Sequence, residues 1–163
     1  MANFEKALID VLAKEGGYAD DPADRGGKTR FGITEAVARK HGYNGAMAEF
    51  PREKAVEIYR MDYWNAVRGD GLPEELGIRM LDLAVNAGPA RAIRALQRAM
   101  GEKEDGIFGP KTLDRLRRSE TAGDIPLIEA RVRLEQLRHY RDIVRRDPSQ
   151  AVFLLGWITR ALA

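Results

Sequence analysis

The stretch KEGGYADDPADRGGKTRFGIT, residues 14–34, interrupts an otherwise helical sequence. Apolar residues before it recur at spacings of three and four, which predicts a helix over residues 3–15. These residues are Phe4, Ala7, Leu8, Val11 and Leu12. Gly16 and Gly17 should end this helix directly after Glu15. The stretch therefore predicts a helix that leads into a polar, glycine-rich loop.

Helical periodicity also dominates the rest of the chain, and no long alternating run indicates a substantial sheet. The predicted helices cover 34–40, 51–67, 73–88, 89–101, 111–118, 124–146 and a segment from 148 onward. Pro51 should open the second of these, and Asp124 should cap the long one. Short strand pieces are predicted at 29–33. The expected fold is mainly α, with one small loop or β-hairpin element near the N-terminus.

Composition excludes several classes of function. The chain has no cysteine and only two histidines, His41 and His139, so thiol nucleophiles, zinc–thiolate sites and a Ser-His-Asp triad are not predicted. The net charge of +2 is too balanced to indicate nucleic acid. Residues 130–146 nevertheless hold six arginines against two acids, which is typical of a solvated helix face or of contact with a polyanion such as a cell envelope. No apolar run is long enough to span a bilayer.

Two other interpretations of the opening stretch fail on spacing. Gly27-Lys28-Thr29 matches the end of a phosphate loop, but Pro22 stands where its first glycine should be. Asp20, Asp21 and Asp24 do not have the spacing of a calcium loop. We therefore predict neither a bound metal nor a cofactor.

Carboxylate chemistry remains. Glu15 should lie at the negative end of the first helix, where the helix dipole and partial burial would raise its pKa. Asp24, in a polar loop, should stay ionised, and the Thr29 hydroxyl could orient a water. Two carboxylates in contrasting environments are typical of glycosidic cleavage. The alternative is that Glu15 is a surface residue and Asp24 a turn former.

The same stretch resembles the signature of glycoside hydrolase family 108, the EGGY-type N-acetylmuramidases, which runs roughly EGGYxxxPxDxGGxTxxGIT. Further similarity lies in YRMDYWNAV, LDLAVNAGPARAIRALQRAMG and DGIFGPKT. The resemblance implies a lysozyme-like fold with a catalytic lobe at 1–88 and a peptidoglycan-binding-like lobe at 89–163, packed as one compact unit. It also implies that Glu15 is the catalytic acid, and it places Tyr18 and Gly32 in the substrate site.

A more distant similarity is to phage-type lysozymes, which have a Glu-x8-Asp-x5-Thr arrangement. The first spacing matches Glu15 and Asp24, whereas Thr29 falls one residue short. The segment VNAG resembles a cleft-lining Asn-x-Gly element and nominates Asn86.

Aromatic residues and one turn motif have two interpretations each. Tyr63 and Trp64 could stack on sugar rings or lie in the core. In DGIFGPKT, Asp105 and Gly106 suit a tight turn before a helix opened by Pro110, or a peptidoglycan contact.

The sequence thus predicts an N-acetylmuramidase that cleaves the β-1,4 bond between N-acetylmuramic acid and N-acetylglucosamine in peptidoglycan glycan strands. Asp24 would stabilise the transition state or activate water. The alternative is a non-catalytic peptidoglycan-binding or envelope-structural protein. Because residues 1–15 have no apolar signal core, we expect a phage or phage-derived endolysin. We also expect the protein to be a monomer. It would be made in the cytoplasm and reach the cell wall by holin-type or other non-Sec release.

Overall fold

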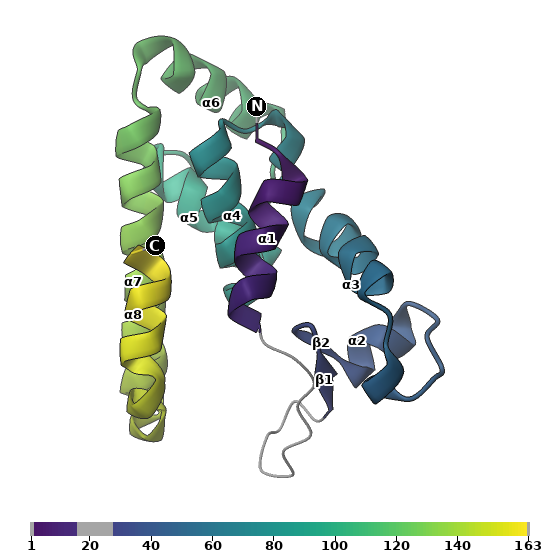
Figure 1. The fold of residues 1–163 in the computed structure, drawn as a ribbon. Coiled ribbons are helices and arrows are strands. Elements are labelled where there is room, and N and C mark those ends of the chain that lie inside the picture. Colours follow the sequence, from purple (N-terminus) through teal and green to yellow (C-terminus); the bar gives the residue numbers. More distant parts are fainter. Residues whose placement is uncertain (1, 16–27, 163) are drawn as a thin grey trace.

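The computed structural model describes residues 2–15 and 28–162, and for residues 13–15 it describes the backbone alone. Within these residues the fold is mainly α-helical with a two-stranded antiparallel sheet, which confirms the predicted fold class (Figure 1). None of the described helices combines the length and apolar character needed to cross a bilayer.

The described elements follow the chain in a simple order. The α-helices are α1 (Phe4–Glu15), α2 (Glu35–Lys40), α3 (Arg52–Ile58), α4 (Glu74–Ala87), α5 (Pro89–Ala99), α6 (Pro110–Ala122), α7 (Ile125–Arg146) and α8 (Leu154–Leu162). The strands are β1 (Thr29–Arg30) and β2 (Ile33–Thr34). Shorter helical segments are η1 (Met47–Glu49), η2 (Tyr59–Trp64), η3 (Gly69–Gly71) and η4 (Pro148–Phe153).

Local sequence signals explain most helix ends. The Thr34 hydroxyl accepts a hydrogen bond from the Val37 amide (3.3 Å) and caps α2. Pro110 opens α6, and Gly123, with φ 76°, ends it. Asp124 precedes α7, but its side chain accepts no capping hydrogen bond, so the predicted side-chain cap is wrong.

The predicted helix over 51–67 is divided. After α3 the chain widens into the π-helical segment η2, in which the Asn65 amide donates to the Arg60 carbonyl (2.9 Å), five residues back. This wider turn changes the angular spacing of the side chains, and periodicity in the sequence does not show it.

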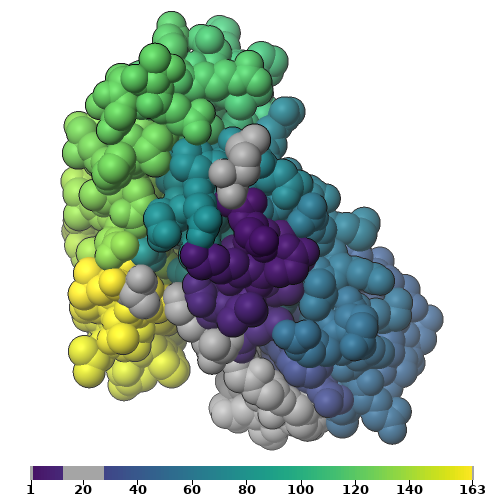
Figure 2. All heavy atoms as spheres, turned by 45° about the horizontal axis from the view of Figure 1, so that its top comes forward, coloured from purple at the N-terminus to yellow at the C-terminus, as the bar shows by residue number. Residues whose placement is uncertain are grey.

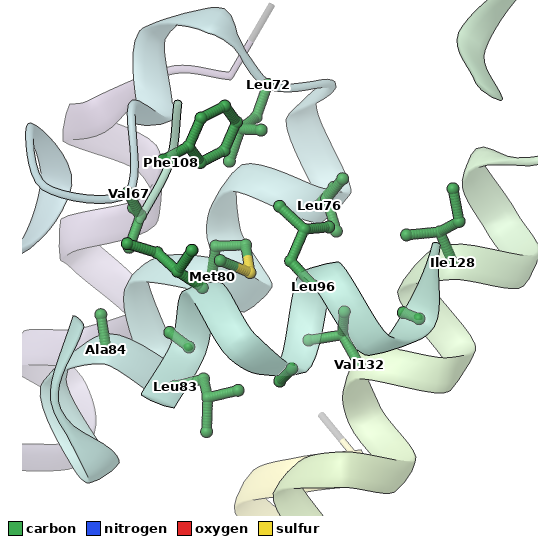
Figure 3. Close-up of a cluster of buried hydrophobic side chains, with 14 of the residues drawn as sticks. Val67, Leu72, Leu76, Met80, Leu83, Ala84, Leu96, Phe108, Ile128 and Val132 are labelled. Carbon is green, nitrogen blue, oxygen red and sulfur yellow. The ribbon is translucent and has the colours of Figure 1, made fainter. Parts of the chain in front are cut away.

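Two clusters of buried apolar side chains form the core. The first joins α1, the hairpin, α2, α3 and η2, and includes Val11, Ile33 and Trp64. The second joins 67–84 to α5, α6 and α7, and includes Met80 and Leu96 (Figure 3). Because this second cluster draws on residues on both sides of Gly88, the N-terminal and C-terminal parts of the chain share one core. Figure 2 shows the two parts in contact over a broad boundary.

Buried polar contacts attach the C-terminal helices to α4. The Asp82 carboxylate, 3% exposed, accepts hydrogen bonds from Arg160 of α8 (2.9 Å) and Gln136 of α7 (2.8 Å). Arg79, 6% exposed, donates to Glu129 (3.0 Å) and to the Ala161 carbonyl (3.0 Å). These charges are paired, so burial does not leave them unsatisfied. They fix α8 against α4 and α7.

Candidate active site

Helix α1 carries the predicted catalytic acid to one end of the molecule. Its buried stripe includes Phe4, Leu8 and Val11, and its last residue is Glu15. Glu15 thus lies in the last turn of α1, at the negative end of the helix dipole. Tyr18 and Asp24 lie outside the described residues.

The chain resumes as a hairpin beside this end of α1. Thr29 pairs with Thr34 and Arg30 with Ile33, so Phe31 and Gly32 form the two-residue turn. Both have positive φ, 52° and 73°, as in the primed turns that suit two-residue hairpins. Ile33 is buried in the same apolar cluster as Val11 of α1. Figure 1 shows the hairpin, whose other strand carries Thr29, beside the C-terminal end of α1.

A buried tyrosine that sequence reasoning missed secures the hairpin turn. The Tyr59 hydroxyl donates to the Phe31 carbonyl at 2.9 Å, and the Tyr59 side chain is 1% exposed. Positive φ is unfavourable for phenylalanine, so this bond stabilises a strained turn. The apolar spacing of α3 could have indicated a buried position for Tyr59, but nothing in the sequence indicates its partner.

The two aromatic candidates from η2 differ in their surroundings. Trp64 is fully buried, and its indole Nε1 donates to the Asp70 carboxylate (2.8 Å). No face of this indole is open to a sugar ring, so the structure gives Trp64 the core role instead of the substrate-binding role. Tyr63 is half-buried beside Tyr59, with ring centroids 5.7 Å apart, and packs against both apolar clusters.

Asn86 lies near the C-terminal end of α4, against α8. With its amide oxygen turned toward Arg160, it accepts from the guanidinium at 2.6–3.2 Å. Since Arg160 also donates to Asp82, Asn86 belongs to the polar contacts that attach α8 to α4. Its predicted place in a substrate cleft remains a prediction.

The DGIFGPKT motif forms the predicted turn. The Asp105 carboxylate accepts from the Ile107 amide (2.9 Å), and Gly106 has φ 76°. The buried Gln97 amide nitrogen lies within hydrogen-bond distance of Asp105 (2.8 Å), the Ile107 carbonyl (3.1 Å) and Thr112 (3.2 Å). The Gln97 oxygen accepts from the Gly106 amide (2.9 Å). The amide and the Ile107 N–H lower the pKa of Asp105, because both stabilise its charged form.

The described residues hold no cluster of three or more histidines and carboxylates that could bind a metal ion.

Comparisons with known proteins identify the family of the chain and a similar fold. The family model described as glycosyl hydrolase 108 matches residues 8–88, and the one described as a predicted peptidoglycan domain matches residues 91–162. The solved structure of Brucella abortus SagA is similar, with 36% identity and a TM-score of 0.80. The alignment covers 97% of this chain and 88% of that chain. A comparison with curated proteins gave no match.

Proposed function

Because this chain belongs to the glycosyl hydrolase 108 family, whose members are lysozyme-like peptidoglycan hydrolases, we propose that it cleaves one specific bond of the glycan strand. That bond is the β-1,4 linkage between N-acetylmuramic acid and N-acetylglucosamine. The product would carry muramic acid at its reducing end. The peptidoglycan domain matched at residues 91–162 supports the same polymer as the partner.

The observation that carries the proposal is the position of Glu15 as the last residue of α1, beside the hairpin that carries Thr29. A carboxyl group at the negative end of a helix dipole retains its proton at higher pH than a free one. Glu15 in this state donates a proton to the leaving glycosidic oxygen. Asp24 is the partner carboxylate, which stabilises positive charge on the sugar or activates water. Thr29 orients that water from β1.

We propose that the protein is a phage or phage-derived endolysin that acts on the cell wall. It would be made in the cytoplasm and released by a holin or another non-Sec route. Contact with an anionic envelope would draw on α7 less than its sequence suggests. Arg131 and Arg133 donate to the carbonyls of Ala99 and Leu162 (3.0 Å each). Those two arginines thus have structural partners, and Arg138 and Arg141 pair with Glu135 and Asp142. We therefore expect Arg145 and Arg146 to contribute most to contact with an envelope.

Glu15→Gln tests the acid directly. General acid catalysis contributes roughly 10²–10⁴-fold, so we expect clearing of permeabilised cells to slow by at least about 10²-fold. The matched control is Glu5→Gln, an exposed glutamate in the first turn of the same helix, which should keep wild-type activity. Equal activity of Glu15→Gln and wild type would exclude the proposed mechanism. A wild-type protein that binds sacculi without clearing cells would be the non-catalytic alternative.

Mass spectrometry of digested peptidoglycan tests the bond. Reducing-end muramic acid is the expected product. Reducing-end glucosamine, or cleaved stem peptides with intact glycan, would contradict the proposal.

A further inference from the structure

A pocket of about 620 Å³ lies between residues 65–71 and helix α6, far from the candidate active site. It is at the end of the molecule where α1 begins, since the Ala2 amide donates to the Leu72 carbonyl (2.8 Å) just beyond the pocket wall. Helix α1 then runs 12 residues to Glu15, a rise of roughly 18 Å. Figure 1 shows α6 and the start of α1 at one end and the hairpin at the other.

The pocket combines an apolar floor with charged side chains around it. The floor is made by Phe108, Leu113 and Leu116, of which Phe108 comes from the DGIFGPKT motif. Arg68 and Arg117 both line the pocket, one from residues 65–71 and one from α6, and Glu120 lies one turn after Arg117. The motif therefore forms a turn and also supplies a residue of the pocket floor.

Both arginines can form ion pairs with a charged ligand. Among the residues that the structure describes, neither guanidinium forms a salt bridge, and Glu120 forms none either. Arg68 instead lies over the Phe108 ring, 5.9 Å from its centroid. Asp70, also in the wall, is already engaged by the Trp64 indole and Arg60.

Arg68 is held in an unusual backbone conformation. Its φ of 54° and ψ of 43° are left-handed, which is uncommon for a residue other than glycine, asparagine or aspartate. Strained residues of this kind cluster at binding and catalytic sites, where the surrounding structure enforces them. From this conformation the Arg68 guanidinium lies over the Phe108 ring of the pocket floor.

We propose that this pocket binds the stem peptide of peptidoglycan, as a second site separate from the glycan-cleaving one. This inference rests on the proposed function, which identifies peptidoglycan as the polymer that the protein binds. Stem peptides carry free carboxylates, a free ammonium group on an uncrosslinked diamino acid, and alanine methyl groups. Arg68 and Arg117 match the carboxylates, Glu120 matches the ammonium group, and the floor matches the methyl groups.

The glycan itself fits this pocket less well. In peptide-bearing strands the lactyl carboxyl group of N-acetylmuramic acid is bound in an amide, so the sugar units are uncharged and are recognised by exposed aromatic faces and amide groups. Among the described residues that line the pocket, Phe108 is the one aromatic residue, and it is only 6% exposed. Binding a peptide at this distance from Glu15 would hold the polymer while its glycan enters the active site. The enzyme should therefore prefer peptide-bearing peptidoglycan to glycan stripped of peptides.

The test is calorimetric titration with a synthetic stem pentapeptide that contains free carboxylates and a free lysine side chain. The variant is Arg68→Asn combined with Arg117→Gln, because asparagine tolerates left-handed backbone and glutamine suits a helix. Charged hydrogen bonds are strong enough that we expect affinity to fall by about tenfold or more. The same variant should raise KM for intact sacculi and leave kcat unchanged.

The matched control is Arg118→Gln, the next arginine on α6, which pairs with Asp114 and does not line the pocket. It should bind the peptide as wild type does. Unchanged affinity in the double variant, an equal loss in Arg118→Gln, or no saturable binding by wild type would each overturn the proposal, as would equal affinity for the fully amidated peptide.

Glu15→Gln keeps this test separate from that of the proposed function. It should slow hydrolysis by at least about 10²-fold and leave peptide affinity unchanged. If Glu15→Gln still hydrolyses peptidoglycan while the peptide titration behaves as expected, the proposed mechanism fails and the second site stands.

Discussion

The hairpin turn at Phe31-Gly32 and the turn at Asp105-Gly106 differ in what holds them. In the second turn, a glycine takes the positive φ, an aspartate accepts from the backbone two residues on, and the nearby Gln97 bonds to the turn from inside. In the hairpin, a phenylalanine takes the positive φ, and the bond to its carbonyl comes from Tyr59, 28 residues away.

The difference shows where the molecule tolerates strain. The turn at Asp105 joins helices of the peptidoglycan domain and has residues suited to its geometry. The hairpin turn lies beside the proposed catalytic end of α1, and the surrounding fold imposes its geometry. Strained turns are expected at such sites because function, and not stability, selects their conformation. Changes at the two turns should accordingly have different consequences.

The largest effect on stability should come from Gln97→Met. Methionine keeps the volume of the side chain, so the change removes the hydrogen bonds to the turn and leaves Gly106 N–H and Thr112 without their buried partner. We expect the free energy of unfolding to fall by about 2–3 kcal/mol, measured by urea denaturation. Hydrolysis by the folded protein should be unchanged.

Lys103→Gln in the same loop is the control, and its effect should stay within about 0.5 kcal/mol because Lys103 is exposed. A Gln97→Met protein as stable as wild type would show that the turn is stable without the hydrogen bonds of Gln97.

A smaller loss of stability, accompanied by a loss of activity, should follow Tyr59→Phe. Removing the hydroxyl leaves the Phe31 carbonyl without this donor, and we expect the free energy of unfolding to fall by about 0.5–1.5 kcal/mol. A displaced hairpin should also slow hydrolysis, because misplacement by 1 Å can cost up to about 10²-fold. Both effects are measurable on one preparation, by denaturation and by cell clearing.

Tyr43→Phe is the matched control. The Tyr43 hydroxyl donates to the Ala46 carbonyl (2.9 Å) within its own loop, so its removal should leave hydrolysis unchanged. If Tyr59→Phe also retained full activity, the hairpin would not depend on Tyr59 for its position.

The smallest effect should be the response of the Asp105 turn to acid. The pKa of Asp105 is lowered in the folded protein, so its contribution to stability is present above the unfolded pKa of about 3.9 and is lost as pH falls through the lower folded value. Asp105→Asn should remove this part of the acid sensitivity, seen as a flatter melting temperature between about pH 4 and pH 2. Asp114→Asn, on the exposed face of α6, should retain the wild-type slope; equal slopes for Asp105→Asn and wild type would contradict the prediction.

The sequence by itself determined most of the helices and several of their ends. Apolar spacing predicted α1 and α4, Gly88-Pro89 predicted the break before α5, and Asp105, Gly106 and Pro110 predicted the turn before α6. These features depend on residues within a few positions of one another, so their physical chemistry can be read along the chain. The EGGY motif likewise identified Glu15 and its place at the end of α1.

Only the tertiary structure decided the contacts between distant segments. It widened the chain into η2, buried Trp64, placed Asn86 against Arg160, and brought Arg68 and Arg117 to one pocket. Each of these results depends on which helix packs against which, and the local spacing of residues does not predict contacts between distant segments. The proposed catalytic acid could be named from a motif, whereas the tyrosine that supports the hairpin and the second pocket required the folded chain.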